Sequence, residues 1–207
     1  MIPLQTKFKQ NTLITKFDEL ERFYNITSLG TNLSTNAFYG CNHLTSVIIP
    51  KEVTSLYSVF LGCSNLIHVN LNNVTAISGA INYECFRSCR NLSDIDFRKV
   101  ETISYQSFYG CSSLQRIYFA NIESIARNSF INCSGIQYVV VDTETIPSVG
   151  DSNGGAFPTG SFSFYVHDDL VESFKTTGQW TRYKTRIKPL SEFITAYPED
   201  AEELGIS

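Results

Sequence analysis

Positive charge and long hydrophobic runs are both scarce in this sequence of 207 residues. Its 16 lysines and arginines are outnumbered by 20 aspartates and glutamates, which gives a net charge of −4. Proteins that bind nucleic acids usually carry a basic surface stripe, so this balance argues against a nucleic-acid partner. No segment approaches the roughly 20 apolar residues that a membrane-spanning helix needs, so we predict no membrane span.

An apolar leader is absent as well. Met1 to Phe17 contains three lysines but no continuous apolar segment, so we expect no secretory signal peptide there. If a signal peptide has been removed, the protein is expected at the cell surface or secreted. Otherwise we expect it in the cytoplasm or in a phage particle.

Sequence motifs of common catalytic and metal sites are missing too. There is no Gly-x-Ser-x-Gly elbow, His-Glu-x-x-His motif or P-loop. Cys41-x-His43 has no second pair at ligand spacing, so we predict no metal site. His68 and Asp94 could form a base-orienting pair, which leaves a hydrolase on a repeat scaffold as a minor alternative. We predict no catalytic residues and no cofactor.

A repeated phrase is what the sequence does contain. The pattern Phe-x-x-Cys-x-x-Leu-x-x-Ile-x-Leu occurs five times, with Phe-to-Phe spacings of 22, 26, 22 and 22 residues. A fixed period in this range predicts a solenoid. The alternating end of each phrase predicts a short strand, and a second apolar pair suits another strand or a turn on the opposite wall. The copies begin at Phe38, Phe60, Phe86, Phe108 and Phe130.

Five of the six cysteines share one position in the repeat. Equivalent positions in a solenoid stack about 4.8 Å apart with parallel side chains, a geometry that suits disulfide bonds poorly. We therefore predict a ladder of buried free thiols. The ladder comprises Cys41, Cys63, Cys89, Cys111 and Cys133, while Cys85 falls outside it as a surface thiol or a packing residue.

The segments around the repeats predict caps. We divide the chain into an N-terminal tail (1–14), an N-terminal helical cap (15–37), the repeats (38–149), a loop with a last strand and a helical cap (150–193), and an acidic tail (194–207). The first cap rests on a capping-box-like start at Thr15 and an apolar stripe that continues to Tyr24. Phe162 to Val166 is predicted as the last strand, and the acidic tail is expected to fray.

Over residues 15–193 the chain resembles the leucine-rich repeats of BspA-type bacterial surface proteins. The resemblance rests on Phe38-Tyr-Gly-Cys-x-x-Leu44, on the strand phrase that ends at Pro50, and on a closing phrase from Tyr165 to Glu192. It implies a leucine-rich-repeat solenoid, an α/β repeat rich in β-structure with about five repeats. It also implies adhesion or recognition of a host matrix, other bacteria or receptors, without catalytic residues.

Side chains between the inward strand positions point outward and form columns across the repeats. They suggest a ligand-binding face, although an ordinary polar surface with pairs such as Asp94 with Arg116 is an equal alternative. We predict a monomeric, non-catalytic binding or adhesion module for a protein or glycan, with a phage or prophage structural or host-recognition protein as the alternative. The candidate residues are His68, Asn70, Asp94, Asp96, Arg98, Arg116, Tyr118 and Tyr138.

Overall fold

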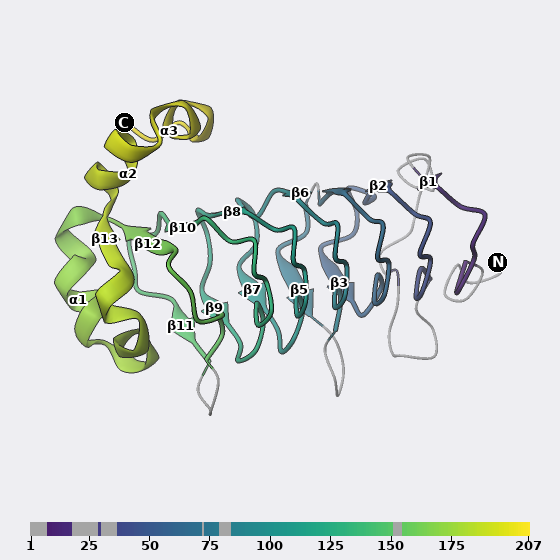
Figure 1. The fold of residues 1–207 in the computed structure, drawn as a ribbon, viewed down its shortest axis with the longest axis horizontal. Helices are drawn as coiled ribbons and strands as arrows, with labels where there is room; N and C mark the ends of the chain where they lie inside the picture. Colours follow the sequence, from purple (N-terminus) through teal and green to yellow (C-terminus); the bar gives the residue numbers. More distant parts are fainter. Residues whose placement is uncertain (1–7, 18–28, 30–36, 72, 79–83, 151–154) are drawn as a thin grey trace.

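The structure is a computed structural model that describes residues 8–17, 29, 37–71, 73–78, 84–150 and 155–207. The chain winds into an elongated stack of short parallel strands, with helices gathered at the C-terminal end (Figure 1). Each of the five repeats, from β2 with β3 to β10 with β11, places one strand on each of two walls. The predicted leucine-rich-repeat solenoid is therefore confirmed.

One wall is made of two four-stranded sheets. The first has the order β1-β2-β4-β6 and comprises Lys16–Phe17, Ser46–Ile48, His68–Asn70 and Asp94–Ile95. The second has the order β13-β12-β10-β8 and comprises Ile187–Pro189, Ser163–Val166, Tyr138–Val141 and Arg116–Phe119. Neighbouring strands place equivalent residues of successive repeats opposite each other, as with Val47 and Val69.

The opposite wall is one five-stranded sheet with the order β11-β9-β7-β5-β3. Each strand has only two or three residues, and Leu56, Ile77, Ile103, Ile125 and Val149 point from it into the core. The second member of each apolar pair thus lies in a strand, and the first member comes just before it. The strands are Ser148–Val149, Ser124–Ile125, Thr102–Ile103, Ala76–Ser78 and Ser55–Tyr57.

A column of stacked phenylalanine rings runs through the core between the walls. Adjacent ring centroids lie 5.4, 5.5, 5.2, 5.1, 5.2 and 4.9 Å apart along the column. The column extends beyond the five repeated phrases, because Phe8 begins it and Phe157 ends it. Phe8 belongs to the predicted tail, so that part of residues 1–14 packs as a further turn.

The predicted thiol ladder is confirmed, since all six cysteines are free and buried. Each ladder thiol also donates a hydrogen bond to the carbonyl oxygen of the phenylalanine one turn earlier. Sγ of Cys89 lies 3.1 Å from the oxygen of Phe60, and the same bond recurs at Cys63, Cys111 and Cys133. The thiols therefore connect successive turns as well as filling space. Cys85 is buried, which removes the surface-thiol alternative.

The turn between each phenylalanine and its cysteine uses a left-handed residue. Its φ is +77° at Gly62 and +78° at Gly110, where glycine carries no steric penalty. The repeat from Phe86 has Ser88 at this position with φ +64°, and the repeat from Phe130 has Asn132 with φ +63°. Two of the repeats thus adopt the same turn with a less suitable residue.

Both ends of the solenoid differ from the predicted caps. Lys16 and Phe17 form β1 and pair with Ser46 and Val47, so the predicted helix start at residue 15 is wrong. The remainder of that predicted helix lies outside the described residues, apart from Leu29 and Ala37. At the other end β12 is not the last strand, because β13 pairs beside it.

Helical segments follow β12, and those before β13 close the far end of the core. They are the 3-10 helix Asp168–Leu170 (η3), α1 (Val171–Thr176), the 3-10 helix Gly178–Arg186 (η4), α2 (Leu190–Ala196) and α3 (Pro198–Leu204). Trp180 is buried and donates its indole hydrogen to the carbonyl oxygen of Pro147 at 2.7 Å. Asp168 does not cap the helix that follows it, since its carboxylate accepts the amide hydrogen of Ser191.

Candidate functional site

The strand register places the predicted outward residues in rows across the wall that carries β2, β4 and β6. Ser46 lies opposite His68, and His68 lies opposite Asp94. On the second sheet of the same wall, Arg116 lies opposite Tyr138. We call the outward side of β2, β4 and β6 the open face, because Asn70, Asp94 and Asp96 on it are exposed.

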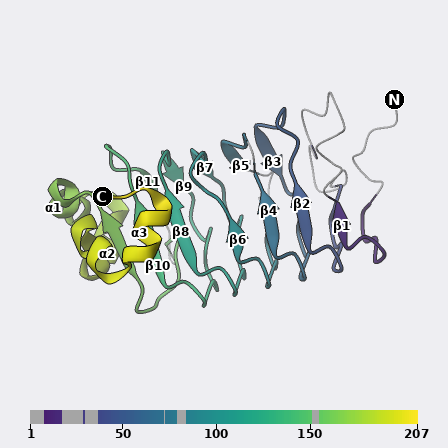
Figure 2. The same cartoon turned by 90° about the horizontal axis from the view of Figure 1, so that it is seen from above.

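The outward side of β8, β10 and β12 is covered, which corrects two predictions. Helices α2 and α3 lie across it, as the view from above shows (Figure 2). The predicted acidic tail is therefore an ordered part of the fold. Tyr138, predicted as a ligand-binding residue, is only 1% exposed. We call this side the covered face.

A small second hydrophobic cluster holds α2 and α3 in place. It contains Tyr138, Val140, Tyr165, Leu190, Phe193, Ala201 and Ile206 and is separate from the main core. The ring of Tyr138 meets that of Phe193 edge-on at a centroid distance of 4.9 Å. Tyr138 and Val140 occupy outward strand positions, but both are buried because helices α2 and α3 cover them.

Polar contacts then fix α3 on the sheet. Nη1 of Arg116 lies 2.9 Å from Oδ1 of Asp200 and 3.3 Å from Oε2 of Glu203. The hydroxyl of Tyr138 donates to Oδ2 of Asp200 at 2.8 Å. The hydrogen bond from Arg116 to Asp200 raises the pKa of the Arg116 guanidinium, while burial and the bond to Asp200 raise the pKa of Tyr138. Arg116 thus pairs with α3 and not with Asp94 as the alternative interpretation had it.

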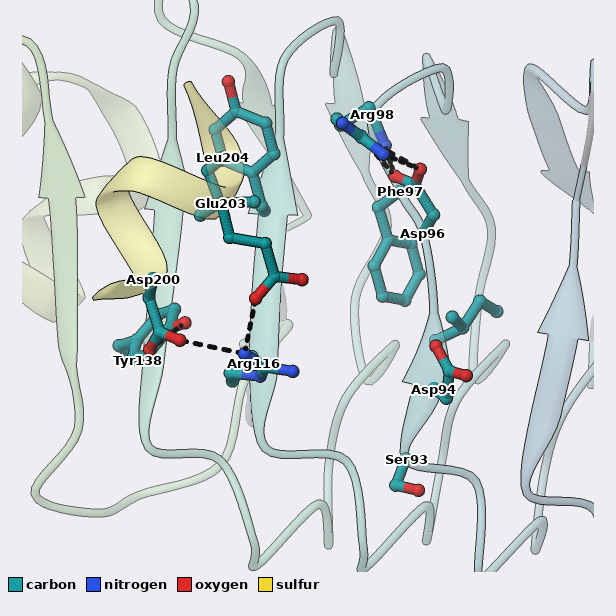
Figure 3. Close-up of a pocket in the computed structure, with 12 residues that line it drawn as sticks. Ser93, Asp94, Asp96, Phe97, Arg98, Arg116, Tyr138, Asp200, Glu203 and Leu204 are labelled. Atoms are coloured by element: carbon teal, nitrogen blue, oxygen red, sulfur yellow. Dashed lines mark hydrogen bonds and ion pairs between the residues drawn. The ribbon is translucent and has the colours of Figure 1, made fainter. Parts of the chain in front are cut away.

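A pocket of about 340 Å³ opens where α3 overhangs the boundary between β6 and β8. We call it the α3 pocket. Figure 3 shows the residues of β6 on one side of it and Arg116, Glu203 and Asp200 on the other. Six of the eight predicted ligand residues line it, namely Asp94, Asp96, Arg98, Arg116, Tyr118 and Tyr138.

Arg98 and Asp96 make a two-pronged ion pair beside this pocket. Nε and Nη2 of Arg98 lie 2.9 and 2.7 Å from Oδ2 of Asp96. Partial burial opposes ionisation of Asp96, but the bonds from Arg98 outweigh it and lower the pKa of the carboxyl. The same pair, with Asn70, lines a second pocket of about 390 Å³. Seven of the eight predicted residues therefore border one of the two pockets.

His68, the eighth residue, pairs with Asp94 at 2.6 Å between Nδ1 and Oδ2. Ser46 on β2 lies opposite His68 on β4, so a serine, a histidine and an aspartate share one row across the strands. The Asp94 side chain is 71% exposed, and a pair so open to water is weak and poorly fixed. We interpret it as a surface ion pair.

Sequence reasoning missed Asp200, Glu203 and Leu204, which form the α3 wall of the pocket. A signal for this helix was present, because Pro198 stands at its first turn and Gly205 follows its last residue. Gly205 has φ +73°, the usual conformation after a helix end. The acidic composition of 194–207 instead led to the prediction of a tail that frays.

A comparison with family models assigns the repeats. The model described as the BspA type leucine-rich repeat region matches residues 14–81 and 31–153, in six copies. The chain belongs to the BspA-type leucine-rich repeat family. The six matched copies compare with the five phrases counted in the sequence, and no match was found among curated proteins.

BspA-type repeats are generally non-enzymatic scaffolds that suggest protein interaction or adhesion. The described part of this BspA-type chain contains no group of three His, Cys, Asp or Glu side chains that could hold a metal ion. Within the same residues no helix has the length and apolar character to cross a membrane.

Proposed function

We propose that this BspA-type protein is a non-catalytic binding module that recognises a protein ligand through the open face and the adjoining α3 pocket. One observation carries the proposal. The outward rows of the solenoid stay accessible over β2, β4 and β6, and they end at a pocket that most of the predicted ligand residues border.

The contrast between the covered face and the open face supports the open face as the binding surface. The chain already covers two of its aromatic outward residues, Tyr138 and Tyr165, with α2 and α3. The open face keeps polar and charged groups such as Asn70 and Asp94. Solenoid proteins use continuous surfaces of this kind for binding, and polar rims around a pocket give an interface its specificity.

A binding screen with matched variants tests the proposal. The protein is applied to an array of extracellular-matrix proteins and receptors, with a glycan array alongside. We expect a protein ligand whose affinity falls at least fivefold for Asp94→Ala and for Asn70→Ala. Glu123→Ala is the matched control, since Glu123 is an exposed acid that adjoins β9 on the opposite wall.

Equal affinity of the three variants for the ligand would remove the open face from consideration. A ligand found only on the glycan array would replace the protein partner by a glycan. Thermal unfolding of each variant is measured in parallel, because only a variant that keeps the wild-type Tm reports on binding.

A further inference from the structure

We propose that the α3 pocket receives a lysine or arginine side chain from an extended basic segment of the partner protein. This inference rests on the proposed function and adds the chemistry of the ligand. It follows from the charges that line the pocket, from their exposure and from the shape of the surface that leads to it.

Carboxylates outnumber guanidinium groups in the pocket. Four acids line it, namely Asp94, Asp96, Asp200 and Glu203, against two bases, Arg98 and Arg116. Both bases are already engaged, because Arg98 pairs with Asp96 and Arg116 pairs with Asp200 and Glu203. The lining therefore keeps a formal charge of −2, which attracts a cation and repels an anion.

Two of the carboxylates can accept a further partner, because Asp94 binds His68 through Oδ2 and Glu203 binds Arg116 through Oε2, and each has a second oxygen. The side chains of Asp94 and Glu203 are 71% and 68% exposed. They approach the pocket from different elements, Asp94 from β6 and Glu203 from α3, and Figure 3 shows them on opposite sides of the space above the sheet boundary. A cationic side chain that enters between them can donate hydrogen bonds to both, the arrangement that charge-assisted recognition favours.

An aromatic ring adds to this preference. Tyr118 is half-buried in the lining, and its hydroxyl donates to Oδ2 of Asp142 at 2.7 Å, which fixes the ring. Asp142 is in turn held by Nε2 of His167 at 2.9 Å. A cation near the face of a fixed tyrosine ring gains a cation–π interaction, most strongly for a guanidinium.

The surroundings favour a chain segment over a free small cation. The α3 pocket shares Asp96 and Arg98 with the second pocket, which Asn70, Leu71 and Lys99 also line. Lys99 makes the second pocket suit peptide backbone better than another cationic side chain. Together they form a polar path from α3 across β6 towards β4. An extended peptide can follow this path with its backbone and anchor one basic side chain beside α3.

An NMR titration of the full chain tests the inference. The probe is an unlabelled, acetylated glycine-lysine-arginine-lysine-glycine pentapeptide, and its neutral control has glutamine at the three basic positions. We expect the basic peptide to shift the amide resonances of residues 94–98 and of α3, and the glutamine peptide to leave them unchanged. Raising the salt concentration should weaken the binding.

Three single substitutions distinguish recognition in the pocket from diffuse electrostatic attraction. Asp94→Asn and Glu203→Gln should each weaken peptide binding about two- to fivefold, the range expected for exposed ion pairs. Glu202→Gln removes the same charge from α3 at an exposed residue outside the pocket lining, so it should change the affinity less than twofold. An equal loss in all three would indicate diffuse attraction and would overturn the inference.

Other outcomes would also overturn it. Equal binding of the glutamine peptide, or shifts confined to other parts of the chain, would show that charge in this pocket does not select the ligand. A trimer of glucosamine presents amino groups on a sugar, so tighter binding of the trimer than of the peptide would reject a protein segment. If the basic peptide fails but an array ligand still depends on Asn70, the proposed function stands and this inference falls.

Discussion

Replacing one thiol of the ladder by a hydroxyl group is expected to make the protein more resistant to alkali. Cys89 is fully buried, and burial, with smaller contributions from Cys63 and Cys85, raises the pKa of its thiol well above the usual value. Cys89→Ser keeps a donor for the carbonyl oxygen of Phe60 and removes the group that ionises. Wild type and variant therefore differ in how their stability depends on pH.

The direction follows from the raised pKa in the folded state. Below the unfolded thiol pKa of about 8.5 both states are protonated, and the thiol adds no pH dependence. As pH rises above that value the unfolded chain ionises while the folded chain does not, so stability is lost until the folded pKa is reached. One such thiol costs about 1.4 kcal/mol at pH 9.5.

The combined effect of the buried thiols is large. Burial raises the thiol pKa at Cys63, Cys85, Cys89 and Cys111, to about 12 at Cys85. Four thiols at about 1.4 kcal/mol each remove roughly 5–6 kcal/mol at pH 9.5, which is comparable with the total stability of a typical domain. We expect the wild-type protein to unfold near pH 10.

Urea unfolding followed by circular dichroism, at pH 7 and pH 9.5 with a reductant present, measures the difference. The free energy of unfolding of the wild type should fall by about 1.4 kcal/mol more than that of Cys89→Ser. Tyrosine ionisation is common to both proteins and cancels in the comparison. Equal losses in the two proteins would refute the argument, because they would mean that the thiol ionises as readily in the folded state.

Three other changes test the fold. Ser88→Gly should raise stability by about 0.5–1 kcal/mol in urea unfolding, since φ at this position is +64°; a loss would contradict the turn. Phe108→Ala interrupts the ring column and should cost about 3–5 kcal/mol, whereas a cost below 1 kcal/mol would argue against a packed core. Deleting α3 should expose Tyr138 and increase binding of a hydrophobic dye while the repeats keep their circular dichroism, and unchanged dye binding would contradict the covered face.

The repeats could be predicted because each turn buries the same types of side chain at the same spacings. Phe60, Cys63 and Leu66 recur at fixed spacings, and the equivalent residues of all five repeats are buried. The turns that contain Phe8 and Phe157 were not predicted, because they do not repeat the whole phrase. Phe8 is followed by Asn11 where the other turns have cysteine, and Asn11 accepts the amide hydrogen of Leu13 instead.

The candidate site was predicted only in part. Outward positions follow from the alternation of a strand, so Asn70, Asp94 and Asp96 could be named from the sequence. Nothing in the repeat indicates which outward positions the chain itself will cover. Tyr138 and Arg116 were assigned to the same face, and both instead contact Asp200, which lies 62 and 84 residues further along the chain.

The amino-acid order alone determined the solenoid, its buried thiols and the direction of each strand side chain, because these depend on interactions within a turn and between neighbouring turns. Only the tertiary structure decided where the surface is open. Helix α3 lies on β8 and β10 through a small apolar cluster and the ion pair from Arg116, contacts between segments far apart in the chain that no repeat period encodes. Those contacts create the pocket and give it its acidic wall.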